Sequence, residues 1–353
     1  MPDASQRAPR ILIVRIGAMG DVLHALPAVA ALRERLPAAY IGWAIEPRWT
    51  PLLTVETTSN VPLVDHIHTV PVRDWKAHPA SLATAKSIRT LRRYLRDQHY
   101  DIAVDLQGTI RSSIVGWLAG TRVFTGSAHP REAVARLFYS QKVPLHQPHV
   151  VQQACEILGA ATGLPLAPAA LSLLPPPSAE AWCNTLFAAL PEAARSRVVV
   201  FSIGGGWGAK RWPPERYGQL AVALQALGYT SLVAVASADN EMALRVVQSS
   251  GGAASIAVSD LPRLTALLRR VVLCIGGDTG PLHLAAALGI PGVGIYGPTD
   301  PARNGPFTPR ARVLRSAQSV TNHSRLQQPE AGLLSIHVED VIHSAMELLQ
   351  PQP

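Results

Sequence analysis

The sequence predicts an α/β fold built from two parallel-sheet domains. The 353 residues suit two domains of about 150 residues each. Strand-like apolar runs alternate with helical patterns along the chain, which is typical of βαβ units with helices on both faces of a parallel sheet. A proline cluster, LPLAPAALSLLPPPSA at residues 164–179, interrupts this alternation. Because proline is poorly tolerated inside helices and central strands, we interpret this segment as the interdomain linker.

The first domain is expected over residues 1–163 and opens with a strand. RILIVRI is followed by glycines and by a pattern that is apolar at helical spacing. Further strands are predicted where short apolar runs recur, and a basic amphipathic helix separates two of them. In chain order these elements are the strand 10–16, the helix 21–36, the strands 40–46 and 65–72, the helix 81–98 and the strand 100–108.

The same alternation restarts after the linker, so residues 180–336 are expected to form the second domain. RVVVFSIGGG runs from a strand into a glycine turn, and VVLCIGG does so again further along. The predicted order is strand 197–206, helix 213–228, strand 230–237, helices 239–251 and 261–270, and strand 271–277. Residues 337–353 begin with HVEDVIHSAMELLQ, which predicts a C-terminal helix.

Composition narrows the class of protein. Hydrophobic residues make up 48% and charged residues 16%, as in a globular chain. The formal net charge of +8 indicates an anionic partner: nucleic acid, a phosphorylated lipid surface or a phosphorylated small substrate. Cys155, Cys183 and Cys274 form no CxxC, which fits a reducing cytoplasm. No apolar stretch reaches the ~20 residues that span a bilayer, so the protein is expected to be soluble or peripheral on a membrane.

Two glycine turns of the second domain have the chemistry of phosphate sites. In GGDTGPLHLAAALG, from residue 276, glycines precede a helix whose free N–H groups and dipole favour an anion. Asp278 is alternatively only an N-cap of that helix. In GGGWGAKRWPPERY, residues 204–217, Lys210 and Arg211 follow the glycines, although the P-loop spacing is absent. These two cations are alternatively a solvated charge pair.

The first glycine turn, RIGAMGDVLHALP at residues 15–27, differs from a dinucleotide site. The third glycine of GxGxxG is missing, and Asp21 at the helix start would repel a pyrophosphate. An NAD-type oxidoreductase is therefore disfavoured. Asp21 is either a helix cap or a carboxylate at the C-terminal edge of the sheet, placed to act as a general base. His24, one turn further on, is either a second polar group there or a histidine satisfied in the core.

Basic residues on predicted loops of the first half are candidates for gripping an anionic acceptor. These are Arg73, Lys76, Arg111 and Arg131. The cations between residues 86 and 96 are explained by a solvated helix face. No Asp, Glu and His cluster has metal-ligand spacing, so no obligatory metal and no cofactor are expected.

Six motifs in order resemble glycosyltransferase family 9, the ADP-heptose-dependent heptosyltransferases of lipopolysaccharide core synthesis. They are MGDVLHALPAV, YDIAVDLQGTIRSS, REAVARLFYS, AKRWPPERY, GGDTGPLHLAAALGIP and YGPTDP. The resemblance implies a GT-B fold, with two Rossmann-like domains facing across a cleft. It places the acceptor on the N-terminal domain and the donor on the C-terminal domain, with the C-terminal helix packing back on the N-terminal one.

The resemblance also implies roles for individual residues. The family's proposed catalytic base matches Asp21, and the lysine that holds the donor pyrophosphate matches Lys210. The turn that touches donor phosphate and sugar matches Asp278, Thr279 and Gly280.

Two donor contacts are less directly matched. The acid that binds the adenosine ribose matches Glu241, with Asp239 close by as an alternative. In the family, a turn that carries Ser or Thr often precedes the lysine. Here the corresponding stretch is SIGGGWG, and Ser202 is the candidate to supply that hydroxyl group. Residues 316–336 match no motif and receive no function.

The implied reaction is inverting transfer of heptose from ADP-heptose to a Kdo residue of Kdo-lipid A. The implied location is the cytoplasmic face of the inner membrane, with no nucleic-acid partner. The alternatives are heptosyltransferase II or another later-acting family 9 enzyme, and a non-catalytic nucleotide-binding or lipid-surface module in which Asp21 is dispensable.

Overall fold

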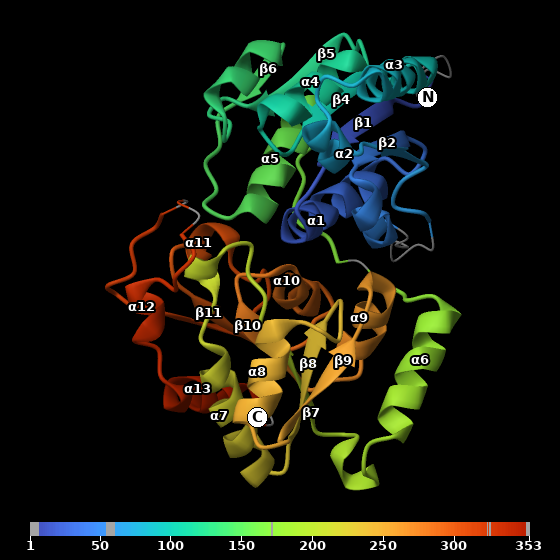
Figure 1. Ribbon diagram of the computed structural model, residues 1–353. Helices are drawn as coiled ribbons and strands as arrows, with labels where there is room; N and C mark the ends of the chain where they lie inside the picture. Colours follow the sequence, from blue (N-terminus) through green and yellow to red (C-terminus); the bar gives the residue numbers. More distant parts are fainter. Residues whose placement is uncertain (1–6, 54–60, 171, 323, 325, 351–353) are drawn as a thin grey trace. The chain divides into compact units, whose positions relative to one another are not determined.

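The computed structural model describes residues 7–53, 61–170, 172–322, 324 and 326–350 (Figure 1). The chain divides into two compact units, Met1–Leu173 and Leu174–Pro353, and the division falls inside the predicted linker. Each unit contains one six-stranded parallel sheet. The predicted α/β class with two parallel-sheet domains is therefore confirmed.

The sheet of the first unit has the strand order β3-β2-β1-β4-β5-β6. Its strands are β1 (Arg10–Val14), β2 (Tyr40–Ile45), β3 (His66–Thr69), β4 (Ile102–Asp105), β5 (Val123–Ser127) and β6 (Gln141–Val143). Its helices are α1 (Met19–Arg35), η1 (Pro47–Leu53), α2 (Val72–Ala77), α3 (Leu82–Asp97), α4 (Ile110–Leu118), η2 (Ala133–Phe138) and α5 (Val150–Thr162), where η marks a 3₁₀ helix. Ile11–Val14 are fully buried, as expected for a central parallel strand covered on both faces.

The second unit repeats this order with β12-β11-β10-β7-β8-β9. Its strands are β7 (Val198–Ser202), β8 (Thr230–Val235), β9 (Ala254–Val258), β10 (Leu273–Gly277), β11 (Gly292–Tyr296) and β12 (Ala311–Arg315). Its helices are α6 (Pro177–Ala188), η3 (Glu192–Ala194), η4 (Gly208–Lys210), α7 (Pro214–Ala226), α8 (Glu241–Ser249), α9 (Leu261–Leu268), α10 (Gly280–Ala287), α11 (Pro301–Asn304), α12 (Ala331–Leu334) and α13 (Val338–Leu349).

Both sheets have the 3-2-1-4-5-6 strand order of a Rossmann fold. Successive strands are therefore added on one side of the first strand, and then, from the fourth strand on, on its other side. In the first unit β1 pairs with β4, and in the second β7 pairs with β10. The loops that leave the carboxyl ends of such paired strands adjoin, and ligands of open α/β sheets bind there. The fold thus brings the predicted site loops of each unit together.

Two elements differ from their expected positions. One linker proline lies inside regular structure, because α6 begins at Pro177. Proline is tolerated at this first helical position, where the backbone N–H has no partner within the helix. The C-terminal helix α13 was expected on the first domain, but it packs on α7, β11 and β12 of the second (Figure 1). Val341 and Ala345 of α13 are fully buried in the core of that unit, and burial of this apolar stripe fixes the helix there.

Acid destabilisation is expected at His68. It is buried in β3, and its Nε2 lies 2.7 Å from the Tyr100 hydroxyl. Burial, and then the neighbouring His66, lower the pKa of His68 to about 4. Between pH 6.5 and 4 this histidine is protonated in the unfolded chain but stays neutral in the native state. The free energy of unfolding therefore decreases as the pH is lowered through this range, by on the order of 3 kcal/mol in total. Urea unfolding at pH 7 and pH 5 should show a smaller loss for His68→Gln than for wild type; equal losses would contradict this assignment.

Candidate functional site

Asp278 is the centre of the polar cluster in the second unit. It follows β10 directly, and its two carboxylate oxygens have different partners. One accepts a hydrogen bond from Lys210 Nζ, and the other lies 3.0 Å from His283 Nε2. Because β7 and β10 pair side by side, the loop after β7 brings Lys210 to a residue that is distant in sequence.

Asp278 is held in its charged form although its side chain is only 12% exposed. Burial opposes the charge, but the interaction with His283 and then the charge of Lys210 hold the pKa of this carboxyl well below its usual range. The N-cap residue of α10 is Thr279, not Asp278, and the carboxylate is directed to Lys210 and His283. The simple helix-cap interpretation of Asp278 is therefore wrong. The ion pair with Asp278 holds the ammonium group of Lys210 at the carboxyl end of the sheet.

Ser202 and Thr279 connect the two loops by their hydroxyl groups. Ser202 ends β7, is buried, and its Oγ lies 2.6 Å from Thr279 Oγ1. The backbone at Gly276 passes so close to Ser202 that a Cβ there would overlap its backbone oxygen. The glycine in this turn thus allows the two loops to pack closely, which brings the predicted donor residues Ser202, Thr279 and Gly280 to one edge of the sheet.

A segment to which the sequence assigned no role packs against the Lys210 turn. Ala209 N donates to Leu326 O, and Glu330 N donates to Ala209 O, at 3.0 and 3.3 Å. Gly208 approaches Gln327 so closely that no side chain fits between them. Part of residues 316–336 therefore fixes the position of the lysine. Local sequence patterns carry no signal for such a long-range backbone contact.

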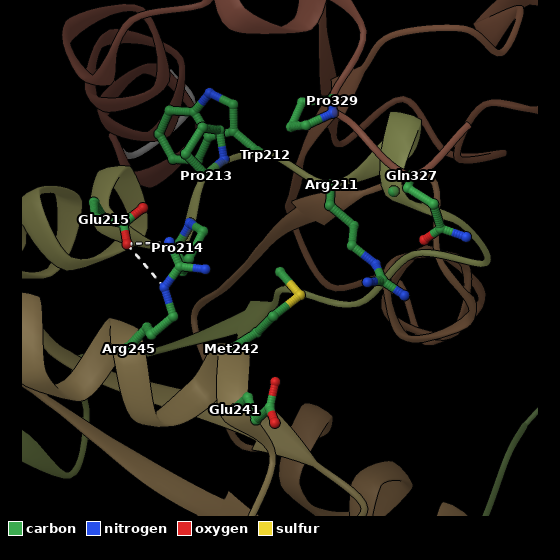
Figure 2. A pocket seen from close by; sticks show the side chains of 11 residues that line it. Arg211, Trp212, Pro213, Pro214, Glu215, Glu241, Met242, Arg245, Gln327 and Pro329 are labelled. Carbon is green, nitrogen blue, oxygen red and sulfur yellow. Dashed lines mark hydrogen bonds and ion pairs between the residues drawn. The ribbon is translucent and has the colours of Figure 1, made fainter. Parts of the chain in front are cut away.

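A cavity of about 380 Å³ lies beside this cluster (Figure 2). Glu241 and Met242 line it from the start of α8, while Trp212 and Pro213 line it from the loop before α7 and Pro214 from the first turn of that helix. Its other lining residues are Gly208, Arg211, Glu215, Arg245, Gln327 and Pro329. It has apolar surfaces and two acids, of which Glu215 is paired with Arg245 and Glu241 is drawn without such a partner (Figure 2). Asp239, the alternative to Glu241, is not among the lining residues and accepts a hydrogen bond from Ser237 instead.

Asp21 occupies the third position of α1, just after β1. Its Oδ1 accepts a 2.8 Å hydrogen bond from Arg15 Nη2, and its Oδ2 accepts one of 3.2 Å from Ala18 N. The cap interpretation is therefore correct in part: Asp21 is not the N-cap residue, but its carboxylate accepts a hydrogen bond from the backbone of the N-cap residue Ala18. The side chain of Asp21 remains 34% exposed, so a substrate can reach it.

Gln107, which sequence reasoning did not single out, connects the loop after β4 to the loop between β1 and α1, the helix that carries Asp21. Its Oε1 accepts hydrogen bonds from Ile16 N and Gly17 N, at 2.8 and 3.3 Å. Arg15 adds a second tie, because it donates to Leu106 O as well as to Asp21. Asp21 is thus held by side chains from both loops at the strand switch. His24 is buried and packs edge-on against His149.

The four predicted acceptor-binding cations are all exposed, but only Arg131 lies in a loop. Arg73 and Lys76 lie in α2, and Arg73 contacts Glu46, with 3.4 Å between Nε and Oε1. Arg111 lies in the first turn of α4, because Thr109 caps that helix through a hydrogen bond from Ser112 N.

The loop of Arg131 is joined to the start of α4. Glu132 accepts a hydrogen bond from Ile110 N through its carboxylate and donates one to Gly108 O through its backbone, at 2.8 and 2.9 Å. The structure therefore brings the Arg131 loop to the Arg111 helix start, while Arg73 is grouped with Glu46 and Arg48.

The described part of the chain contains neither a metal-binding cluster nor a helix suited to span a membrane. No group of three or more His, Cys, Asp or Glu side chains there is placed to hold a metal ion. None of the helices in the same ranges combines the length and apolar character needed to cross a bilayer.

Two Rossmann-ordered units in one chain, each with its candidate residues at the strand switch, have the architecture of the GT-B fold. A solved structure supports this fold: E. coli heptosyltransferase WaaC with ADP has a TM-score of 0.77 at 24% identity, over 96% of this chain and 99% of the other. The chain belongs to glycosyltransferase family 9 (heptosyltransferase), whose model matches residues 88–333. The resemblance carried by the six motifs is thereby confirmed, and the protein is an enzyme of this family.

Curated relatives cover most of the chain. Lipopolysaccharide heptosyltransferase 1 of Pseudomonas aeruginosa is 26% identical over 302 residues, which is 84% of this chain and 81% of the relative. Lipopolysaccharide heptosyltransferase 2 of Escherichia coli (strain K12) is also 26% identical, over 337 residues and 92% of both chains. The family and these relatives agree with the predicted heptosyl transfer. They include heptosyltransferases 1 and 2 and so do not distinguish between these two enzymes.

Proposed function

We propose that this enzyme transfers heptose from ADP-heptose to a Kdo residue of the lipopolysaccharide inner core, with Kdo-lipid A as acceptor. The observation that carries the proposal is the largely buried Lys210–Asp278 pair, because it brings a cation and two glycine turns together beside a cavity of about 380 Å³. Relatives named lipopolysaccharide heptosyltransferase and a solved relative with ADP support the donor class. The reaction occurs at the cytoplasmic face of the inner membrane.

The donor is proposed to occupy the second unit. Its adenosine enters the cavity, where Met242 and the prolines offer apolar surface and Glu241 accepts hydrogen bonds from the ribose hydroxyls. Lys210 moves from Asp278 to the pyrophosphate. The turn at residues 278–280 contacts phosphate and sugar, with free N–H groups at the start of α10 favouring the negative charge.

Asp21 is proposed to act as the general base. A hydroxyl of Kdo attacks the anomeric carbon of heptose on the side opposite ADP, and Asp21 takes the hydroxyl proton. The bond from that carbon to the ADP oxygen breaks, and its electron pair leaves with ADP, so the configuration inverts. Lys210 stabilises the charge that develops on the pyrophosphate, and activity is therefore expected to persist in EDTA.

The exposed cations Arg73, Lys76, Arg111 and Arg131 are proposed to bind the acceptor. Guanidinium and ammonium groups suit the carboxylates of Kdo and the phosphates of lipid A. Their positions on three separate segments fit an acceptor that is large and carries several charges.

Glu241→Ala is expected to weaken ADP binding about tenfold or more. Loss of hydrogen bonds to a charged partner costs about 1.5–3 kcal/mol, which corresponds to roughly 10–100-fold in Kd. Isothermal titration with ADP measures this change. Asp239→Ala is the matched control, because Asp239 lies two residues away but outside the cavity lining; equal losses in both variants would move the ribose contact away from Glu241.

The step in core synthesis is tested by offering two acceptors. We expect heptose transfer to Kdo-lipid A and little transfer to an acceptor that already carries the first heptose. The reverse preference would assign the alternative, heptosyltransferase II, which the 26% identity to a heptosyltransferase 2 keeps open.

A further inference from the structure

Exposed apolar side chains gather on two adjacent segments of the first unit, α4 and η2. Trp117 is 60% exposed and Leu137 is 82% exposed, and Ile114 and Val134 are also exposed. The two segments pack against each other, with the rings of Trp117 and Phe138 6.5 Å apart. We call the exposed side chains of α4 and η2 the α4–η2 face.

The outward position of these side chains follows from the helix geometry. Arg111, Ile114 and Trp117 recur at three-residue intervals and therefore share one side of α4, whereas Val115 and Leu118 are buried on the other. In η2 only Ala135 is buried among residues 133–137. The core of the unit is thus completed by other residues, and the large apolar groups remain on the surface.

Cations surround these apolar groups. Arg111, Arg131 and Arg136 are exposed within or next to the face, whereas the neighbouring acid Glu132 is engaged with the backbone of α4. Helix α3 lies against α4 (Figure 1), and a 3.4 Å hydrogen bond from Arg96 Nε to Leu118 O joins the two segments. It adds further exposed cations, at Lys86, Arg89, Arg92 and Arg93.

We infer that the α4–η2 face docks this enzyme on an anionic lipid bilayer. Apolar and aromatic side chains that enter the headgroup region bind stably only when basic residues are also attracted to anionic lipids, and the neighbouring arginines supply that attraction. A protein partner is less suited, since an exposed Trp and Leu ringed by cations match a surface that is uniformly anionic and has an apolar interior. Arg111 and Arg131 belong to both this face and the proposed acceptor set, so docking presents the enzyme to a lipid acceptor. The inference rests on the proposed function for that last point only.

Vesicle co-sedimentation tests the inference. Wild type should bind vesicles of phosphatidylcholine with phosphatidylglycerol and not vesicles of phosphatidylcholine alone, with binding that weakens as salt rises. The double variant Trp117→Ser/Leu137→Ser should bind the anionic vesicles at least about tenfold more weakly. The control Val222→Ser/Leu227→Ser removes exposed apolar groups from α7 and its end in the second unit, and should bind like wild type.

A second measurement separates docking from catalysis. ADP release with a water-soluble Kdo acceptor that lacks acyl chains should be unchanged in Trp117→Ser/Leu137→Ser, which also shows that the variant is folded. Binding of anionic vesicles by the variant at the wild-type level would overturn the inference, as would a wild type that ignores the vesicles. A change in sedimentation coefficient without a change in vesicle binding would assign the face to protein association instead. Failure of wild type on every acceptor would refute the proposed function while leaving the vesicle result interpretable.

Discussion

Asp21→Asn should lower kcat for heptose transfer by about 10²–10⁴-fold, the usual contribution of a general base. The amide keeps the shape of the carboxylate and can still accept a hydrogen bond from Arg15, but it cannot take the proton of the attacking hydroxyl. ADP affinity should change little, because the donor residues belong to the other unit of the chain. Steady-state rates and ADP titration measure the two effects separately.

The matched control for this variant is Asp97→Asn. Asp97 is exposed at the end of α3, and the same chemical change there should leave kcat within about twofold, as surface substitutions usually do. A kcat for Asp21→Asn within tenfold of wild type would move the base to another residue and leave Asp21 with its capping role alone.

Lys210→Met should lower kcat by about 10²–10³-fold, comparable to the removal of one preorganised donor from a charged transition state. The methionine keeps much of the length of the lysine but cannot stabilise the departing pyrophosphate. Stability should fall as well, because Asp278 loses its cation while remaining buried, and an uncompensated buried charge typically costs about 3–5 kcal/mol.

A double variant separates the two effects of Lys210. In Lys210→Met/Asp278→Asn the unpaired carboxylate is gone, so the urea midpoint should recover toward wild type while kcat stays low. Recovery of kcat along with stability would mean that Lys210 acts only by keeping the fold intact.

The fold was predictable because its signals are local. Apolar runs such as Ile11–Val14, glycines after strands and apolar residues at helical spacing mark the elements of each sheet without knowledge of their partners. The short strands β5, β6, β9 and β12 were missed, since a few residues carry little periodicity.

The contacts of the candidate site were less predictable, because they depend on pairing between distant segments. Lys210 and Asp278 each stood out in a glycine turn, but their ion pair requires β7 and β10 to be neighbours. The same holds for Gln107, whose tie to the Asp21 loop follows from the pairing of β1 with β4. Arg73 and Arg111 were predicted in loops for two reasons. The six-residue helix α2 is too short to show a helical period, and the local cap signal of Thr109 before α4 was overlooked.

The most direct test of heptosyl transfer is the stoichiometry of one incubation: purified enzyme, ADP-heptose and Kdo-lipid A, with ADP quantified and the acceptor weighed by mass spectrometry. We expect one ADP for each acceptor that gains one heptose, and almost no ADP when the acceptor is left out. ADP formed at the same rate without acceptor, or a tightly bound donor with no Kdo-bearing acceptor gaining mass, would contradict heptose transfer to Kdo.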